Sequence, residues 1–293
     1  MKIINEKVKT PDNFELDVEM RIPEGEVKKI VIMSHGLTSY KEGRRNQLLQ
    51  IANALCDDGF KVIQYDFRGH GKSSGTNLDV CPSSLKTDLE TIVNNYIQNE
   101  EYYLFGFSFG GFATCEYLFY TNNTSVRKVV LIGPPLDPIN SSLLNPKEFC
   151  QPEIQEAIDS GSLERNGYAY WSSKDFRVSK KFLQECYEFD YTSAMKCLSG
   201  RTLLLQGKND KNVDKDYNEK YSKEYDFKYI EFDASHSLWE KIDDAINEIK
   251  KYYNDWYVDL KKLIQMNEEK WFNKTGINCK ITTYEKLPAK AYK

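Results

Sequence analysis

The stretch that decides the fold is residues 102 to 119, YYLFGFSFGGFATCEYLF. It is apolar from end to end, except where Gly106, Ser108, Gly110 and Gly111 interrupt it. Glycine weakens a strand and a buried hydroxyl needs a partner, so these residues add nothing to a plain core strand. A serine between close glycines, where a strand gives way to a helix, instead predicts a strained turn that exposes one hydroxyl.

On both sides of this stretch, short apolar runs alternate with segments of helical period. The strand-like runs are residues 14–23, 29–35, 60–67, 102–107, 127–133, 201–207 and 227–233. Helical spacing marks residues 48–55, 85–96, 110–120 and 242–264, and a charged helix-like segment lies between 207 and 227. Strands that alternate with helices indicate parallel crossover units. The sequence therefore predicts an α/β fold, with a mostly parallel central sheet and helices on both faces.

One interval, residues 136–198, breaks this alternation. It has no clear strand of its own, is rich in aromatic residues, and separates two strands that should be neighbours in the sheet. An unstructured loop of that length is improbable in a compact domain. We therefore expect a small helical cap at 136–198, inserted into a core formed by residues 1–135 and 199–256.

The C-terminal segment, residues 257–293, is expected to be a mainly helical extension. From Trp239 to Thr275 there is neither Gly nor Pro, and apolar residues keep a helical period. Ile277, Cys279 and Ile281 then alternate like a short strand. The large apolar residues of this tail could pack on the core, lie on a membrane surface, or pair with a second copy of the chain to give a homo-oligomer.

Composition narrows the function class. The 293 residues are 40% hydrophobic, enough for one large domain. A net charge of −4 without a basic run predicts no nucleic-acid partner. No apolar stretch approaches the roughly 18 residues of a membrane span, and the first residues lack the apolar core of a signal peptide. Seven scattered cysteines without a CxxC pair predict reduced thiols and a cytoplasmic protein.

A serine hydroxyl attacks slowly unless a base takes its proton and an acid orients that base. In α/β sheets with a serine elbow, the chain order is Ser, then Asp or Glu, then His. His236 is the only one of three histidines that follows Ser108. Asp210 comes immediately after the preceding predicted strand, with Asp214 as the alternative acid. His35 stands before Ser108 and is the less favoured base.

The oxyanion of the attack also needs donors. One is expected to be the backbone N–H of Phe109, directly after the nucleophile. The other is placed on Leu37, in the loop after the strand at 29–35, where Gly36 lets the backbone turn. Two phosphate-binding interpretations fail: a dinucleotide fingerprint needs glycine where Ser108 stands, and Asp66 occupies the first glycine of a P-loop.

In order along the chain, SHGLTS, YDFRGHGKSSG, GFSFGG, LLLQGKNDKNV and ASHSL resemble the landmarks of the α/β-hydrolases. They look most like the branch of serine aminopeptidases, cinnamoyl esterases and monoglyceride lipases, over roughly residues 14 to 255. The resemblance implies the α/β-hydrolase fold, with Ser108 as nucleophile, Asp210 as acid, His236 as base, and Leu37 and Phe109 as oxyanion-hole donors. It implies no cofactor and no metal, and it makes RGHGKSSG, with His70, mainly a structural loop.

The cap is poorly matched to any pattern in that family, and residues 257–293 are an extension that the family does not require. We therefore expect a serine hydrolase that cleaves a carboxylic ester of a small molecule through an acyl-enzyme. Four alternatives remain open: an acyl thioesterase, an acyltransferase, a peptidase, or a non-catalytic binding protein of the same fold.

Overall fold

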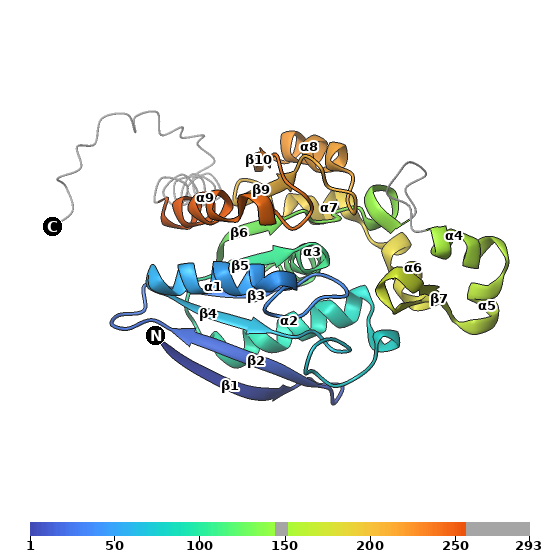
Figure 1. Ribbon diagram of the computed structural model, residues 1–293. Helices are drawn as coiled ribbons and strands as arrows, with labels where there is room; N and C mark the ends of the chain where they lie inside the picture. Colours follow the sequence, from blue (N-terminus) through green and yellow to red (C-terminus); the bar gives the residue numbers. More distant parts are fainter. Residues whose placement is uncertain (144–151, 256–293) are drawn as a thin grey trace, which may run out of the picture. The chain divides into compact units, whose positions relative to one another are not determined.

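The computed structural model describes residues 1–143 and 152–255 (Figure 1). The chain divides into two compact units, Met1–Tyr253 and Asn254–Lys293. The elements described below belong to the first unit. The predicted extension at 257–293 therefore lies outside the described residues. Within the described part of the chain, no helix is long and apolar enough to cross a membrane.

The core is an eight-stranded sheet in the order β1-β2-β4-β3-β5-β6-β9-β10. β1 and β2 pair antiparallel, as do β2 and β4, and every other neighbouring pair is parallel. Its strands are β1 (Lys2–Lys9), β2 (Glu15–Ile22), β3 (Lys29–Ser34), β4 (Phe60–Tyr65), β5 (Tyr102–Phe107), β6 (Val126–Ile132), β9 (Thr202–Gly207) and β10 (Lys228–Phe232). The mostly parallel sheet that the sequence predicts is confirmed.

The helices around this sheet fall close to the segments of helical period. They are α1 (Gln47–Asp57), α2 (Pro82–Tyr96), α3 (Phe109–Thr121), α8 (Lys215–Glu224) and α9 (Ile242–Asn254). Helical spacing continued to residue 264 in the sequence, but residues beyond 255 are outside the described part.

Two successive tyrosines show how the sheet is covered on both faces. The hydroxyl of Tyr102 lies 2.8 Å from that of Tyr117 on α3, whereas the ring of Tyr103 lies 5.2 Å from that of Tyr253 on α9. Side chains alternate across a strand, so α3 and α9 lie on opposite faces of β5 (Figure 1). Such double coverage explains why every residue of β5 is buried.

The cap differs from the prediction. Between β6 and β9 the chain forms a π-helical turn (Ile139–Leu143), α4 (Pro152–Asp159), α5 (Ser162–Asn166), β7 (Tyr168–Trp171), β8 (Phe176–Ser179), α6 (Lys180–Glu188) and α7 (Tyr191–Lys196). The expectation of no strand in this interval is wrong, because β7 and β8 pair as an antiparallel hairpin. The two strands that the interval separates, β6 and β9, are neighbours as predicted.

Candidate active site

Ser108 lies between the end of β5 and the start of α3. Its backbone has φ 51° and ψ −124°, a conformation that costs a non-glycine residue on the order of 1–3 kcal/mol. The turn is held by its N–H, which donates to the carbonyl of Ile132 at 2.8 Å, and by its carbonyl, which accepts from the N–H of Gly111 at 2.8 Å. Within the described residues its hydroxyl has no hydrogen-bond partner. The hydroxyl is therefore left available at the turn.

The glycines around Ser108 allow the backbones of α3, β5 and β3 to approach one another closely. A Cβ on Gly106 would lie 2.5 Å from the Cα of Gly111, and one on Gly110 would lie 2.3 Å from the carbonyl oxygen of Ser34. Both distances are far below any tolerable contact, so a side chain at either position would push α3 away from β5 or β3. The small residues that the sequence singled out are thus a packing requirement of the turn.

Asp210 follows β9 and holds His236 by a buried hydrogen bond. The Nδ1 of His236 lies 2.7 Å from Oδ2 of Asp210, and that oxygen also accepts from the side-chain amide of Gln206 at 2.8 Å. The other oxygen accepts from the backbone N–H groups of Asn212 at 2.8 Å and Val213 at 3.0 Å. Four donors fix the carboxylate, and its contact with Nδ1 leaves Nε2 of the imidazole free to face a substrate.

The alternative acid, Asp214, has a different task. It is the N-cap residue of α8, where its side chain accepts from the backbone N–H of Asp216 at 3.1 Å. An aspartate at an N-cap satisfies one of the N–H groups left unpaired at the start of a helix. Of the two aspartates, the structure brings Asp210 to His236.

Ser108 and His236 line the same cavity, whose volume is about 520 Å³. Leu37 and Phe109 line it as well, and neither of their backbone N–H groups donates a hydrogen bond within the described residues. Gly36 brings the loop after β3 against the nucleophile, because a Cβ there would lie 3.0 Å from the Cβ of Ser108. The residues proposed from sequence as nucleophile, base and oxyanion donors therefore border one space.

Gly133, at the end of β6, is a site residue that sequence reasoning missed. It has φ +50°, and a Cβ on it would lie 3.0 Å from both Cε1 and Nδ1 of His236. The absence of a side chain makes room for the imidazole. The only signal in the sequence was a glycine at the end of a predicted strand, which alone does not show what passes over it.

His35 is ruled out as the base by its contacts. Its Nδ1 donates to the carbonyl of Gly36 at 2.8 Å, and its Nε2 accepts from the backbone N–H of Phe67 at 3.0 Å. The ring is buried, and burial holds its pKa well below the ordinary value. Both ring nitrogens are occupied by the backbone, so His35 is structural.

His70 connects the RGHGKSSG loop to the loop that carries Leu37. Its Nδ1 donates to the carbonyl of Arg68 at 2.9 Å, which leaves Nε2 to accept from the backbone N–H of Thr38 at 3.2 Å. Thr38 has φ 61°, so this bond fixes a strained residue directly after Leu37. His70 does not line the cavity. It acts on the site through the position of the oxyanion loop.

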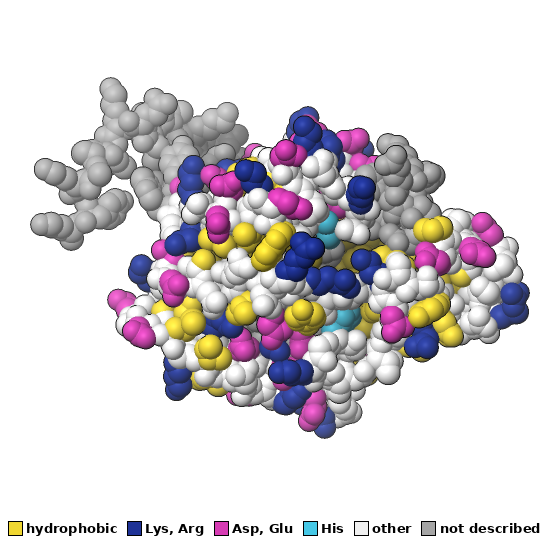
Figure 2. All heavy atoms as spheres, viewed as in Figure 1, with side chains coloured by type: hydrophobic (Ala, Val, Ile, Leu, Met, Phe, Trp, Pro, Cys, Tyr) yellow, Lys and Arg dark blue, Asp and Glu magenta, His cyan; other side chains and the backbone are white. Residues whose placement is uncertain are grey.

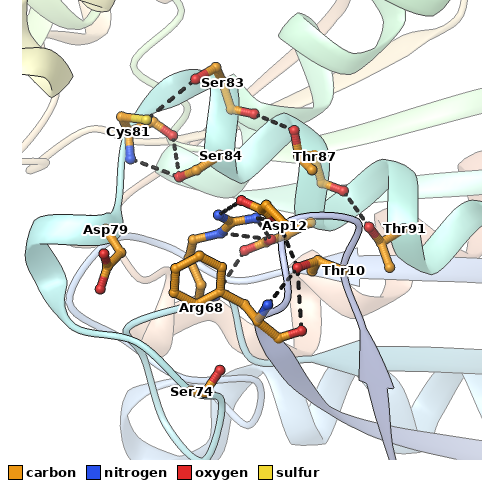
Figure 3. A network of polar contacts seen from close by, with 12 residues as sticks. Thr10, Asp12, Arg68, Ser74, Asp79, Cys81, Ser83, Ser84, Thr87 and Thr91 are labelled. Atoms are coloured by element: carbon orange, nitrogen blue, oxygen red, sulfur yellow. Dashed lines mark hydrogen bonds and ion pairs between the residues drawn. The ribbon is translucent and has the colours of Figure 1, made fainter.

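Arg68, the first residue of the RGHGKSSG loop, anchors this loop through polar contacts (Figure 3). Its guanidinium pairs with Asp12 and Asp88 and lies over the ring of Phe14, 4.3 Å from the centroid. Burial raises the pKa of Asp88 to about 6, although the Arg68 guanidinium opposes that rise. The network makes the RGHGKSSG loop the structural element that the resemblance implied.

No group of three or more His, Cys, Asp or Glu among residues 1–143 and 152–255 is arranged to hold a metal ion. What the arrangement offers is an available hydroxyl, an oriented imidazole and two unused N–H groups around one cavity.

Comparison with known proteins places the chain in a family. Residues 25–188 match the family described as serine aminopeptidase, S33, which is more than half of the chain. An uncharacterized 31.7 kDa protein of Escherichia coli is 36% identical over 98 residues, which are 31% of this chain and 33% of that protein. The chain thus spans about a third of the length of this curated relative.

Solved structures agree in fold. A putative hydrolase from Agrobacterium vitis S4 has 19% identity and a TM-score of 0.69, over 86% of this chain and 99% of that one. Est1E from Butyrivibrio proteoclasticus, solved with ferulic acid bound, has 17% identity and a TM-score of 0.69, over 85% and 97%. The chain has the α/β-hydrolase fold, and it belongs to the serine aminopeptidase S33 family.

Proposed function

We propose that this protein is a hydrolase that cleaves a carboxylic ester, with Ser108 as nucleophile, His236 as general base and Asp210 as the residue that orients the base. The observation that carries the proposal is that a strained, unpartnered serine shares one cavity with an imidazole whose Nδ1 is held by a buried carboxylate. This is the arrangement that activates a serine hydroxyl.

The reaction proceeds in two half-steps. The hydroxyl of Ser108 attacks the ester carbonyl while Nε2 of His236 takes its proton, and the N–H groups of Leu37 and Phe109 donate to the oxyanion. His236 then protonates the leaving alcohol, and the acyl group remains on Ser108. A water molecule attacks the acyl-enzyme with His236 again as base, which releases the acid and restores the serine.

Thioesters and amides can use the same groups, and an acyltransferase differs in admitting an alcohol or amine in place of water. We place the ester before the amide because an alcohol is a better leaving group than an amine, and before the thioester because the solved structures of this fold include esterases. A binding protein of this fold is disfavoured, since it would have no use for a strained serine beside an oriented imidazole.

A fluorophosphonate probe tests the nucleophile. The wild-type protein should be labelled with one equivalent at Ser108, as located by peptide mass spectrometry, and Ser108→Ala should not be labelled. Ser237→Ala removes another hydroxyl that lines the same cavity and should keep the label on Ser108. Labelling of Ser108→Ala at equal rate would reject the assignment.

Acyl specificity is measured separately with p-nitrophenyl esters of increasing chain length. A rapid release of p-nitrophenol equal to the enzyme concentration, followed by slower turnover, is expected from an acyl-enzyme. The absence of turnover with esters, together with hydrolysis of thioesters or amides, would replace the ester by one of the other substrates.

A further inference from the structure

The cavity beside Ser108 is cationic, although the whole chain carries a net charge of −4. Within the described part of the chain, no acidic residue lines the cavity. Four of its lining residues are basic: Arg44, Arg45, Lys174 and Lys211. They come from three separate segments, the loop before α1, the cap after β7, and the loop after β9. Figure 2 shows Lys and Arg side chains gathered in the middle of this face, beside histidine atoms.

These cations form no ion pair with a carboxylate in the described part of the chain. Arg44 donates to the backbone carbonyl of Thr38 at 3.0 Å, whereas Arg45, Lys174 and Lys211 form no ion pair among residues 1–143 and 152–255. Burial lowers the pKa of Lys174, and the nearby positive charge of Arg44 lowers it further. The positive charge of Arg45 contributes to lowering the pKa of Glu240, but Glu240 does not line the cavity. Like charges that converge on a cavity with no carboxylate in its lining are unfavourable, so they call for a ligand that compensates them.

The backbone and a buried hydroxyl support the same conclusion. Arg45 and Asn46 have φ 57° and 59°, a left-handed conformation that costs each residue on the order of 1 kcal/mol. Strain of this kind gathers where a loop is shaped for binding. Ser39 lines the cavity as well, and its buried Oγ has no hydrogen-bond partner within the described residues. An unpartnered buried hydroxyl is a further group prepared to donate to an anion.

We propose, on the basis of the serine hydrolase function above, that the substrates are anionic acyl compounds. They are esters or thioesters that carry a carboxylate or phosphate group, and Arg45, Lys174 and Lys211 hold that group while the carbonyl lies at Ser108. The charge can sit on the acyl chain or on the leaving group. The same cations would bind the charged group in either position, and two pairs of substrates distinguish the two positions.

The first pair places the charge on the acyl side. In p-nitrophenyl pentanoate and mono-p-nitrophenyl glutarate, chains of equal methylene number end in a methyl group or in a carboxylate. The second pair places the charge on the leaving group. S-butyryl-N-acetylcysteamine and butyryl-coenzyme A share the thioester and its neighbouring atoms, but only the coenzyme carries phosphates. Spontaneous hydrolysis is subtracted for every substrate.

A triple variant tests the three cations: Arg45→Gln, Lys174→Gln and Lys211→Gln together. A control triple variant, Lys196→Gln, Lys220→Gln and Lys251→Gln, removes the same charge from exposed residues that do not line the cavity. Each exposed cation that pairs with the anionic group of the substrate is expected to raise kcat/KM about two- to fivefold. The cavity variant should therefore lose on the order of tenfold or more in kcat/KM for the anionic substrate of each substrate pair. The neutral member should change less than about twofold.

Salt gives a second readout. In wild type, kcat/KM for the anionic substrate should fall several-fold between about 20 mM and about 300 mM salt, since surface charges are screened within about 10 Å at 0.1 M. The control variant should keep this dependence and the cavity variant should lose most of it. The substrate pair whose anionic member is preferred tells whether the acyl chain or the leaving group carries the charge.

Equal turnover of both members in both pairs, unchanged by salt and by the cavity variant, would overturn the anionic-substrate inference while leaving Ser108 as nucleophile. Hydrolysis that persists in Ser108→Ala would instead reject the proposed function. If no acyl donor is turned over at all, calorimetric binding of coenzyme A and of glutarate still decides the matter. Binding weakened by the cavity variant and not by the control supports the cationic site, and equal or absent binding rejects it.

Discussion

The Nδ1 of His236 lies 2.7 Å from Oδ2 of Asp210, and the carboxylate is held in turn by Gln206 and two backbone N–H groups. Three donors other than His236 therefore fix the position of the Asp210 carboxylate. This preorganisation selects one tautomer of the imidazole and directs its other nitrogen away from the acid.

Replacing Asp210 should reduce activity far more than stability. Asp210→Asn offers an amide where His236 needs an acceptor, so kcat is expected to fall about 10³- to 10⁴-fold. Asp214→Asn is the matched control, because asparagine also caps helices well. It should keep kcat within about twofold of wild type. Steady-state kinetics on both variants, with melting curves to confirm folding, check this; the reverse ranking would transfer the role to Asp214.

Gly133 should prove to be a residue that the active histidine requires. Gly133→Ala introduces a Cβ 3.0 Å from two atoms of the His236 ring, so the ring must move and kcat should fall on the order of 10- to 100-fold. Gly167→Ala is the control, since Gly167 also has positive φ, +77°, but its Cβ would meet nothing within 4 Å. Both variants should lose about 1 kcal/mol of stability. Equal activities in the two variants would show that the imidazole does not need this space.

His70 should affect kcat through the oxyanion loop. In His70→Ala the N–H of Thr38 loses its acceptor, the loop with Leu37 shifts, and kcat is expected to fall about tenfold with little change in KM. His70→Gln, whose carbonyl oxygen can accept that N–H, should restore part of the loss. A fall in thermal stability alone, with kcat unchanged in both variants, would make His70 a packing residue and no more.

Glu116 on α3 should make the free energy of unfolding depend on pH. It is buried, one carboxylate oxygen has no hydrogen-bond partner within the described residues, and burial raises its pKa from 4.5 to about 8, with Glu185 adding to the rise. Folding thus favours the protonated carboxyl. Its contribution to stability is greatest below pH 4.5 and is lost as pH rises to about 8.

Glu116→Gln should consequently be more stable than wild type at pH 8, by on the order of 3 kcal/mol, and nearly equal to it at pH 5. Glu188→Gln, at an exposed position on α6, is the control and should leave the pH dependence as it is. Urea unfolding at both pH values measures the difference. A Glu116→Gln protein that is equally or less stable at pH 8 would contradict the assigned protonation.

The sequence predicted the buried part of the fold well, and it failed at the exposed edges. β5 and its neighbours are apolar runs because both faces are covered, so periodicity and length identify them. β1 was not predicted, since it is an edge strand: Ile3 is 47% exposed, and polar residues fill most of the strand without alternation. The hairpin of β7 and β8 was missed because four-residue strands rich in aromatics do not show a period.

For the site, motif order along the chain identified Ser108, Asp210 and His236 as candidates, and the structure brings Asp210 to His236 and places Ser108 on the same cavity. The residues that were not predicted belong to the site because they contact, or share the cavity with, residues that are distant in sequence. Gly133 matters because an imidazole more than 100 positions later passes over it. The cations of the cavity come from separate loops whose meeting no local pattern reveals. Such juxtapositions belong to tertiary packing rather than to spacing in sequence.

Whether Ser108 and His236 act as one catalytic unit is measured by the kcat/KM of a p-nitrophenyl ester for Ser108→Ala, His236→Ala and the double variant. Groups that act as one unit give losses that do not multiply. We expect each single variant to lose at least about 10⁴-fold and the double variant to lose no more than the worse single one. Losses that multiply, or a Ser108→Ala protein that keeps its activity, would contradict this expectation.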